Sequence, residues 1–95
     1  MILIKLQRYE QTPLMYACRA QNFFLVDLLV KHGAKIDAQD DNGWTPLSHA
    51  SYNGCLKSVK KLLRHGADPI IHTIDYLYPF DLAKKNGHTE VNEMR

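Results

Sequence analysis

The sequence predicts an all-α solenoid of stacked helix-turn-helix units, and three observations support that prediction. A 23-residue segment occurs twice, at an offset of 33 residues. Each copy holds two apolar stripes at helical spacing, separated by a short polar break. Each copy also begins with a helix-start signal and ends with a helix-stop signal. Because units of this length bury their apolar faces only against neighbouring units, the pattern indicates a repeat array.

The repeat is visible when two segments are aligned without a gap. Residues 12–34 read TPLMYACRAQNFFLVDLLVKHGA and residues 45–67 read TPLSHASYNGCLKSVKKLLRHGA, with nine identical positions. The same offset relates Gly54 to Gly87, so YPFDLAKKNGHTEV is a third copy that stops within its second helix. We expect a single domain over residues 1–95, with repeats at about 7–39, 40–72 and 73–95.

The first helix of each full copy has a clear start. The hydroxyls of Thr12 and Thr45 are suited to cap a helix, and the prolines that follow fit the first helical position, where a missing N–H is tolerated. Apolar and small residues then recur at helical spacing, at Leu14, Ala17, Leu47 and Ala50. We expect a short helix here, with alanines that let a neighbouring helix approach closely.

The second helix of each copy has its own apolar stripe, which we expect to face the core. Its members are Phe24, Val26, Leu29 and Val30 in the first copy and Leu56, Val59, Leu62 and Leu63 in the second. A His-Gly pair then ends each helix, because Gly readily takes the left-handed conformation of a C-terminal cap. In the third copy, Asn92 falls at the core-facing position of Val26 and Val59.

Polar segments such as KIDAQDDNG connect the copies, and their Asn-Gly pair signals a tight turn. Asp40 and Asp41 are adjacent carboxylates on this turn, and we expect both to be solvated. One unit therefore consists of a projecting turn and two helices.

This pattern resembles the ankyrin repeat, whose 33-residue unit is a turn followed by two antiparallel helices, stacked into a curved solenoid. The resemblance is strongest over residues 12–67 and extends to Val91. It implies a module that binds another protein through a concave surface of turn tips and first-helix side chains.

The sequence departs from the family pattern in two places. Three residues stand where the family has a His after Thr-Pro-Leu, namely Met15, Ser48 and Asp81. His49 lies one position further on; it either replaces the hydrogen bond of the family's His to the neighbouring turn or is a partly exposed side chain, which we favour. The turn glycine Gly43 corresponds to Glu10 in the first copy and Tyr76 in the third, so we expect both outer turns either to be distorted or not to follow the pattern of an internal repeat.

The family's variable contact positions, carried over residue by residue, define a candidate partner-binding set. Its members are Arg8, Tyr9, Gln11, Arg19 and Ala20 in the first copy, Asp41, Asn42, Trp44, Tyr52 and Asn53 in the second, and Ile74, Asp75, Leu77, Lys85 and Asn86 in the third. Trp, Tyr and Arg dominate interface hot spots, which favours Trp44 and Tyr52 as anchors. For Trp44 the alternative, in which the ring packs on the next turn, stays open.

Other classes of function find no support in the residues. The sequence has no phosphate-binding Gly motif and no nucleophile–base pattern, so we expect neither an enzyme nor a cofactor. The five histidines lack zinc-ligand spacing with Cys18 or Cys55, which argues against a metal site. With a net charge of +2 and interspersed Lys and Arg, no basic patch for nucleic acid is evident. The apolar start MILIKL is far shorter than the roughly 20 residues of a membrane span.

These exclusions leave a monomeric intracellular module, cytoplasmic or nuclear, whose partner is another protein. A second hypothesis is that the chain is the structural end, or a fragment, of a longer ankyrin array with no binding role of its own. The incomplete third copy favours it, because an array needs about three repeats for stability. Exposure of Trp44 and Tyr52 would favour the binding hypothesis.

Overall fold

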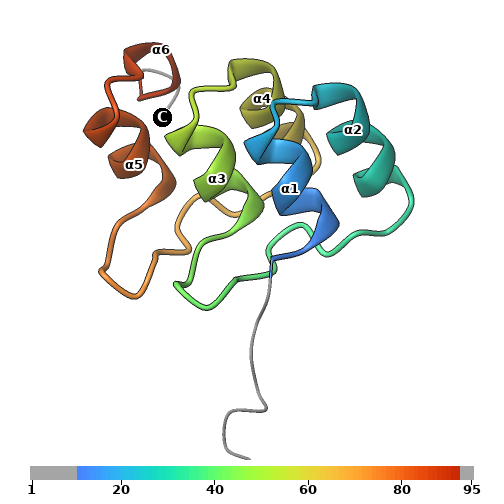
Figure 1. The fold of residues 1–95 in the computed structure, drawn as a ribbon, viewed down its shortest axis with the longest axis horizontal. Helices are drawn as coiled ribbons and strands as arrows, with labels where there is room; N and C mark the ends of the chain where they lie inside the picture. Colours follow the sequence, from blue (N-terminus) through green and yellow to red (C-terminus); the bar gives the residue numbers. More distant parts are fainter. Residues whose placement is uncertain (1–10, 93–95) are drawn as a thin grey trace, which may run out of the picture.

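The computed structural model describes residues 11–92, which form two layers of helices joined by loops (Figure 1). The inner layer contains α1 (Pro13–Arg19), α3 (Pro46–Tyr52) and α5 (Pro79–Lys85). The outer layer contains α2 (Phe23–Lys31), α4 (Leu56–Arg64) and α6 (Thr89–Asn92). Successive helix pairs pack side by side, α1 and α2 against α3 and α4, and α3 against α5. Residues 11–92 contain no β-strand, so the predicted all-α solenoid is confirmed.

The inner helices begin where the sequence predicts, each with a proline at the first helical position. Thr45 Oγ1 accepts the Ser48 N–H at 3.1 Å, and Ser48 Oγ accepts the Thr45 N–H at 3.1 Å. In the third copy the Asp81 carboxylate accepts the Tyr78 N–H at 2.9 Å. Ser48 and Asp81, at the position of the family's His, therefore satisfy N–H groups at the start of their own helices.

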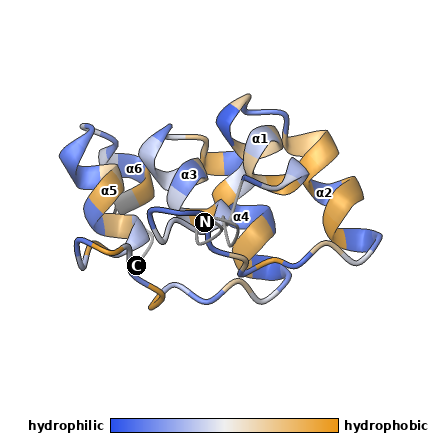
Figure 2. Cartoon of the chain, turned by 60° about the horizontal axis from the view of Figure 1, so that its bottom comes forward, coloured by the Kyte–Doolittle hydropathy of each residue, from blue (hydrophilic) through white to orange (hydrophobic). Residues whose placement is uncertain are grey.

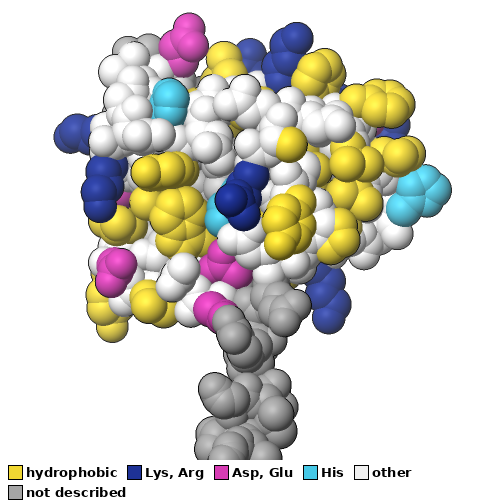
Figure 3. Space-filling view, in the orientation of Figure 1, with side chains coloured by type: hydrophobic (Ala, Val, Ile, Leu, Met, Phe, Trp, Pro, Cys, Tyr) yellow, Lys and Arg dark blue, Asp and Glu magenta, His cyan; other side chains and the backbone are white. Residues whose placement is uncertain are grey.

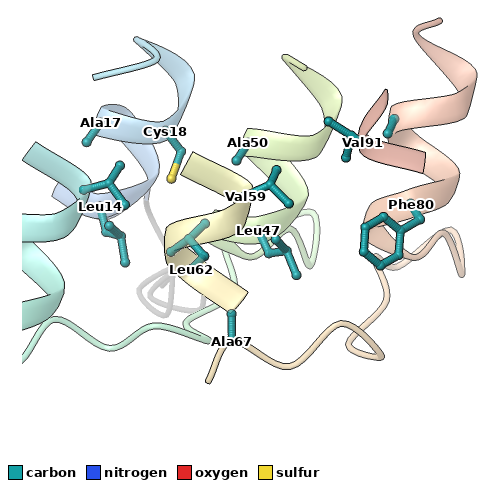
Figure 4. Close-up of a cluster of buried hydrophobic side chains, with 12 residues drawn as sticks. Leu14, Ala17, Cys18, Leu47, Ala50, Val59, Leu62, Ala67, Phe80 and Val91 are labelled. Atoms are coloured by element: carbon teal, nitrogen blue, oxygen red, sulfur yellow. The ribbon is translucent and has the colours of Figure 1, made fainter. Parts of the chain in front are cut away.

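The hydrophobic core lies between the two layers. Figure 4 shows Leu14 and Leu47 of the inner layer and Val59 and Leu62 of the outer layer within this space. Each of these four side chains is at most 1% exposed. Cys18 is also fully buried, and burial raises the pKa of its thiol to about 12, so it packs as a small apolar group.

One member of the predicted core stripe is misplaced. Phe24 is 71% exposed, whereas Val26 is buried and Leu29 and Val30 are half-buried. Residues two positions apart on a helix point to different sides, so Phe24 cannot share a face with Val26. The helix α2 is accordingly hydrophobic over much of its surface (Figure 2). The side chain of Asn92 lies outside the described residues.

The second and third turns have the same geometry. The Gly43 N–H donates to the Asp40 carbonyl at 2.9 Å, and Gly43 has a φ of 80°. The Tyr76 N–H donates to the Thr73 carbonyl at 2.9 Å, and Tyr76 has a φ of 62°. The expected distortion of the third turn is therefore wrong, because a tyrosine takes the left-handed conformation that favours glycine. The first turn, with Glu10, lies outside the described residues.

The two described turns also contact each other. The Ile74 N–H donates to the Asn42 carbonyl at 3.0 Å, which joins the tips of the second and third repeats. A Cβ atom on Gly43 would lie 2.9 Å from the Ile74 nitrogen. Gly43 is thus required by the close approach of the next turn, whereas its left-handed conformation is one that Tyr76 also adopts in the third turn.

The second turn is fastened to the inner layer by a group of polar contacts that we call the turn clasp, made by Asp40 and His49. Asp40 Oδ1 accepts the N–H groups of Asn42 and Trp44 at 2.9 and 3.0 Å, and Asp40 Oδ2 lies 3.0 Å from His49 Nε2. Asp40 is 7% exposed and His49 is 6% exposed. The expected solvation of Asp40 and partial exposure of His49 are both wrong, because each group satisfies the other inside the fold.

Two opposing effects act on the His49 imidazole. Burial lowers its pKa below the ordinary value of 6.5, while the hydrogen bond to Asp40 raises it, and burial prevails. A nearby Arg19 guanidinium also lowers the pKa of His49. In the 3.0 Å hydrogen bond between the two side chains, the His49 Nε2–H donates to Asp40 Oδ2.

The lowered pKa of His49 predicts that acid destabilises the fold. Between about pH 7 and pH 5 the unfolded chain binds a proton at this histidine before the folded chain does, so the free energy of unfolding decreases as pH falls. Urea unfolding at a series of pH values measures this slope. The His49→Leu variant should have a smaller slope over the same interval, and an unchanged slope would assign the effect to other histidines.

The two-layer core predicts that buried leucines dominate stability. Leu47→Ala and Leu62→Ala should each lower the free energy of unfolding by about 2–5 kcal/mol, because both leave cavities between the layers. Leu28, which is 42% exposed on α2, provides the matched control. Urea unfolding of the three variants should show a clearly smaller loss for Leu28→Ala, and equal losses would contradict this placement of the core.

Candidate partner-binding surface

The candidate residues lie along the inner helices and the turns. Arg19, Tyr52 and Lys85 follow one another at the 33-residue offset, at the C-terminal ends of α1, α3 and α5, and all three are exposed. The face that contains these helices is the one seen in Figure 3, where hydrophobic side chains lie on both sides of a central basic group. Arg8 and Tyr9 lie outside the described residues.

Trp44 and Tyr52 form an aromatic pair on this face, with Trp44 just before the middle inner helix α3 and Tyr52 at its end. Their ring centroids are 5.3 Å apart in an edge-to-face arrangement, and Trp44 also lies 5.0 Å from the His49 ring. Tyr52 is 36% exposed and Trp44 is half-buried. Since Asp40 binds both the Trp44 N–H and the His49 imidazole, the turn clasp positions the aromatic pair.

Two neighbouring groups hold Arg19 beside α1. The guanidinium donates a hydrogen bond to the Gln11 carboxamide oxygen, and it lies 5.8 Å from the centroid of the Tyr16 ring. Both contacts restrict a long side chain that would otherwise lose freedom on binding. Arg19 is thus an exposed cation in a defined position.

Two candidate residues use their amide groups within the fold. Asn53 Nδ2 donates to the His49 carbonyl at 2.9 Å, and Asn86 Nδ2 donates to the Tyr52 carbonyl at 2.7 Å. Gln21 in turn donates to the Asn53 carbonyl at 3.1 Å. The three bonds satisfy carbonyl groups at the end of α3, and those from Gln21 and Asn86 also connect adjacent repeats. Asn53 and Asn86 therefore have structural roles irrespective of any partner.

The turn tips give the lower edge of the face an acidic character. Asp41 and Asp75 are exposed there, together with Asn42 and Ile74, while Leu77 is half-buried. Figure 3 shows acidic side chains at this edge, over the turns. The surface therefore combines an aromatic centre, cations at the helix ends and carboxylates at the tips.

The third turn adds an aromatic group that the candidate set omits. Tyr76 is 75% exposed, and its ring centroid lies 4.8 Å from that of His72. His72 also lies 5.7 Å from the Tyr78 ring, which is 43% exposed. The signal in the sequence is a tyrosine at the turn-glycine position, which indicates a displayed side chain once the turn keeps its regular geometry.

Residues 11–92 contain no group of three or more His, Cys, Asp or Glu side chains with the geometry to hold a metal ion.

Within the described part of the chain, every helix is too short or too polar to cross a lipid bilayer.

Comparison with known proteins identifies the family that shares this architecture. The family model for ankyrin repeats in three copies matches residues 2–73. The chain is 38% identical over 82 residues to the tyrosine-protein kinase Shark of Drosophila melanogaster, an alignment that covers 85% of this chain and 9% of that protein. It is 33% identical over 84 residues to the putative E3 ubiquitin-protein ligase XBAT34 of Arabidopsis thaliana, with coverage of 85% and 22%.

A third relative, the ankyrin repeat, SAM and basic leucine zipper domain-containing protein 1 of Ateles geoffroyi, is 44% identical over 88 residues, which is 88% of this chain and 18% of the relative. The chain thus spans less than a quarter of the length of each of these three relatives. Together with the 33-residue helix pairs, the match over residues 2–73 shows that the chain belongs to the ankyrin-repeat family.

Proposed function

We propose that the chain binds a partner protein through the concave face formed by its inner helices and turn tips. Ankyrin repeats are in general protein-interaction modules. The observation that supports a specific site is the partly exposed Trp44–Tyr52 pair, because aromatic side chains of this kind supply most of the energy at interface hot spots.

The geometry favours a preformed binding surface. The turn clasp holds Trp44 against α3, and Gln11 and Tyr16 restrict Arg19, so a partner would order few side chains on contact. Binding to side chains that are already positioned avoids part of the entropic cost of association. A partner would place apolar surface on the aromatic pair and carboxylates near Arg19 and Lys85.

The proposal extends to the setting of the module. We propose a monomer that acts by binding rather than by catalysis, in the cytoplasm or nucleus. Both thiols of the described residues, Cys18 and Cys55, are free, and a reducing compartment would keep them so.

Site-specific photocrosslinking tests where the partner sits. A photoreactive phenylalanine analogue at Tyr52 should capture a protein in cells, since Tyr52 lies at the centre of the proposed face. The same analogue at Phe24, an exposed aromatic position on the outer layer, provides the matched control. Adducts identified by mass spectrometry should appear at position 52 and not at position 24. The reverse result would contradict the proposed face.

The captured partner then allows a mutational test. Trp44→Ala and Tyr52→Ala should each weaken its binding by about tenfold or more, as expected for hot-spot aromatic residues. Phe24→Ala should leave the dissociation constant unchanged. Circular dichroism must show that all three variants are folded, and unchanged binding of both inner-layer variants would contradict the site.

A second candidate function is supported by the end of the array at α1 and α2. Tyr16 is 58% exposed, whereas His49 and Leu82, at the same position of the second and third repeats, are 6% and 1% exposed. Lys57 and Lys61 contact α2, and their counterparts on α2 are the exposed Phe24 and Leu28. This open apolar end would suit an element of a longer array with no partner of its own.

Unfolding of the 95-residue chain distinguishes the two candidates. For an independent binding module we expect urea transitions by circular dichroism and by Trp44 fluorescence to coincide, because the described helix pairs then unfold as one unit. Separate or non-cooperative transitions would favour the array element, since repeats that depend on missing neighbours unfold one by one.

A further inference from the structure

The outer-layer helices α2 and α4 carry an excess of positive over negative charge. The helices α2 and α4 contain five cations and one carboxylate, whereas the whole chain has a net charge of only +2. The expectation from the sequence that Lys and Arg are interspersed with acids is wrong for this layer. The cations are Lys31, Lys57, Lys60, Lys61 and Arg64, and the carboxylate is Asp27.

Asp27 neutralises part of this positive charge. It lies 3.2 Å from the Lys31 ammonium, 3.3 Å from His65 Nε2 and 3.7 Å from the Lys61 ammonium. The hydrogen bond with His65, followed by that with Lys31, lowers the pKa of Asp27 below its ordinary value, so the carboxylate is ionised at neutral pH. The single Asp27 carboxylate thus interacts with Lys31, Lys61 and His65 at once.

The remaining cations of α4 have no such partner within residues 11–92. Lys60 and Arg64 are exposed and make no ion pair with any described side chain. Lys57 contacts an aromatic ring instead, with its ammonium 4.7 Å from the centroid of Phe23. The side of α4 that faces solvent is therefore basic and electrostatically uncompensated.

These cations surround a recess, which we call the basic hollow, lined by Phe23, Lys57, Lys60, Lys61 and Arg64. Its volume is about 190 Å³, and Phe23 contributes an aromatic surface that is 38% exposed. Lysine and arginine stems add further apolar surface below their charged ends. The basic hollow therefore offers an apolar recess with positive charge around its rim.

The fold does not require this arrangement. At the 33-residue offset, Lys60 corresponds to Asp27 and Lys57 corresponds to Phe24, so the basic hollow belongs to the second repeat and its neighbour rather than to the shared repeat pattern. Val59 and Leu62 fill the core positions of α4, and none of these cations is part of the core. Their gathering on one helix is a property of the surface, which is where binding residues are free to vary.

We propose that the basic hollow is a second protein-binding site, on the opposite layer from the concave face, and that it takes an acidic segment carrying one apolar side chain. The apolar side chain enters the recess against Phe23, and flanking carboxylates pair with Lys60 and Arg64. Removal of apolar surface from water drives the contact, and the cations select an acidic partner and speed its approach.

Two other anionic partners fit the basic hollow less well. A protein that neutralises about six to ten phosphates needs a similar number of cations, and the basic hollow has four, of which Lys61 already pairs with Asp27. A flat anionic bilayer surface would contact the cations at the rim without filling the recess, so the apolar part of the basic hollow would stay unused. An acidic protein segment uses both the recess and its rim.

Fluorescence anisotropy with defined probes tests the proposal. The first probe is a labelled helical peptide with Glu on one face and Leu on the other; the second has Gln for Glu, and the third has Ala for Leu. We expect the full chain to bind the first probe at least about tenfold more tightly than either of the others, because recess and rim both contribute. Equal binding of the first and third probes would overturn the role of the recess.

Variants of the chain locate the site. The affinity for the first probe should decrease by about tenfold or more in the double variant Lys60→Glu with Arg64→Glu, and also in the single variant Phe23→Ala. Lys84→Glu with Lys85→Glu makes the same charge change on α5 and should have a small effect that disappears at high salt. Circular dichroism verifies the fold of each variant. If both charge-reversal pairs lost the same affinity for the first probe, the effect would come from net charge alone, and the proposed site would be overturned.

Two further probes settle the class of partner. Vesicles of phosphatidylserine with phosphatidylcholine, and single-stranded oligo-dT, are titrated under the same conditions. Binding of either probe that depends on Lys60 and Arg64, in the absence of peptide binding, would overturn the assignment to an acidic protein segment. Trp44→Ala, a change in the concave face, should leave peptide binding intact. A failure of the proposal for the basic hollow is therefore distinguishable from a failure of the proposal for the concave face.

Discussion

Every other feature of this chain depends on the burial of apolar faces between successive helix pairs. The helices within residues 11–92 have at most nine residues, too short to be stable alone, so each gains stability from the helices of the adjacent repeat. The helix α3 has neighbours on both sides and is buried from Pro46 to Ser51. That central position is why α3 can hold a buried histidine and serve as the support for the aromatic pair.

The turns show that one structural task can be met by different side chains. Asp40 accepts the N–H groups two and four residues ahead through its carboxylate, and Thr73 does the same through its hydroxyl, at 3.2 Å for both bonds. What the turn requires is an oxygen at this place, as in Asx and Ser/Thr turns. The two turns differ in their further contacts, since Asp40 also binds His49 while Tyr76 adds an exposed aromatic ring to the third turn.

The two layers separate two kinds of surface. On the inner layer, aromatic groups lie among carboxylates and cations, and the turn clasp fixes their geometry. On the outer layer, basic side chains surround an aromatic recess. Both surfaces are made from positions that the core leaves free, which is how a repeat protein with a shared core acquires different partners.

The sequence by itself determined the helix pairs, their starts and ends, the 33-residue offset and most of the core, because caps, apolar periodicity and Gly stops act within a few residues. The resemblance to the ankyrin repeat also named Trp44 and Tyr52 as candidate contact residues. Only the tertiary structure decided that Asp40 and His49 are buried, that Phe24 is exposed, and that α4 cations surround a recess of α2. These properties depend on which surfaces neighbouring elements cover or bring together, and no local pattern contains that information.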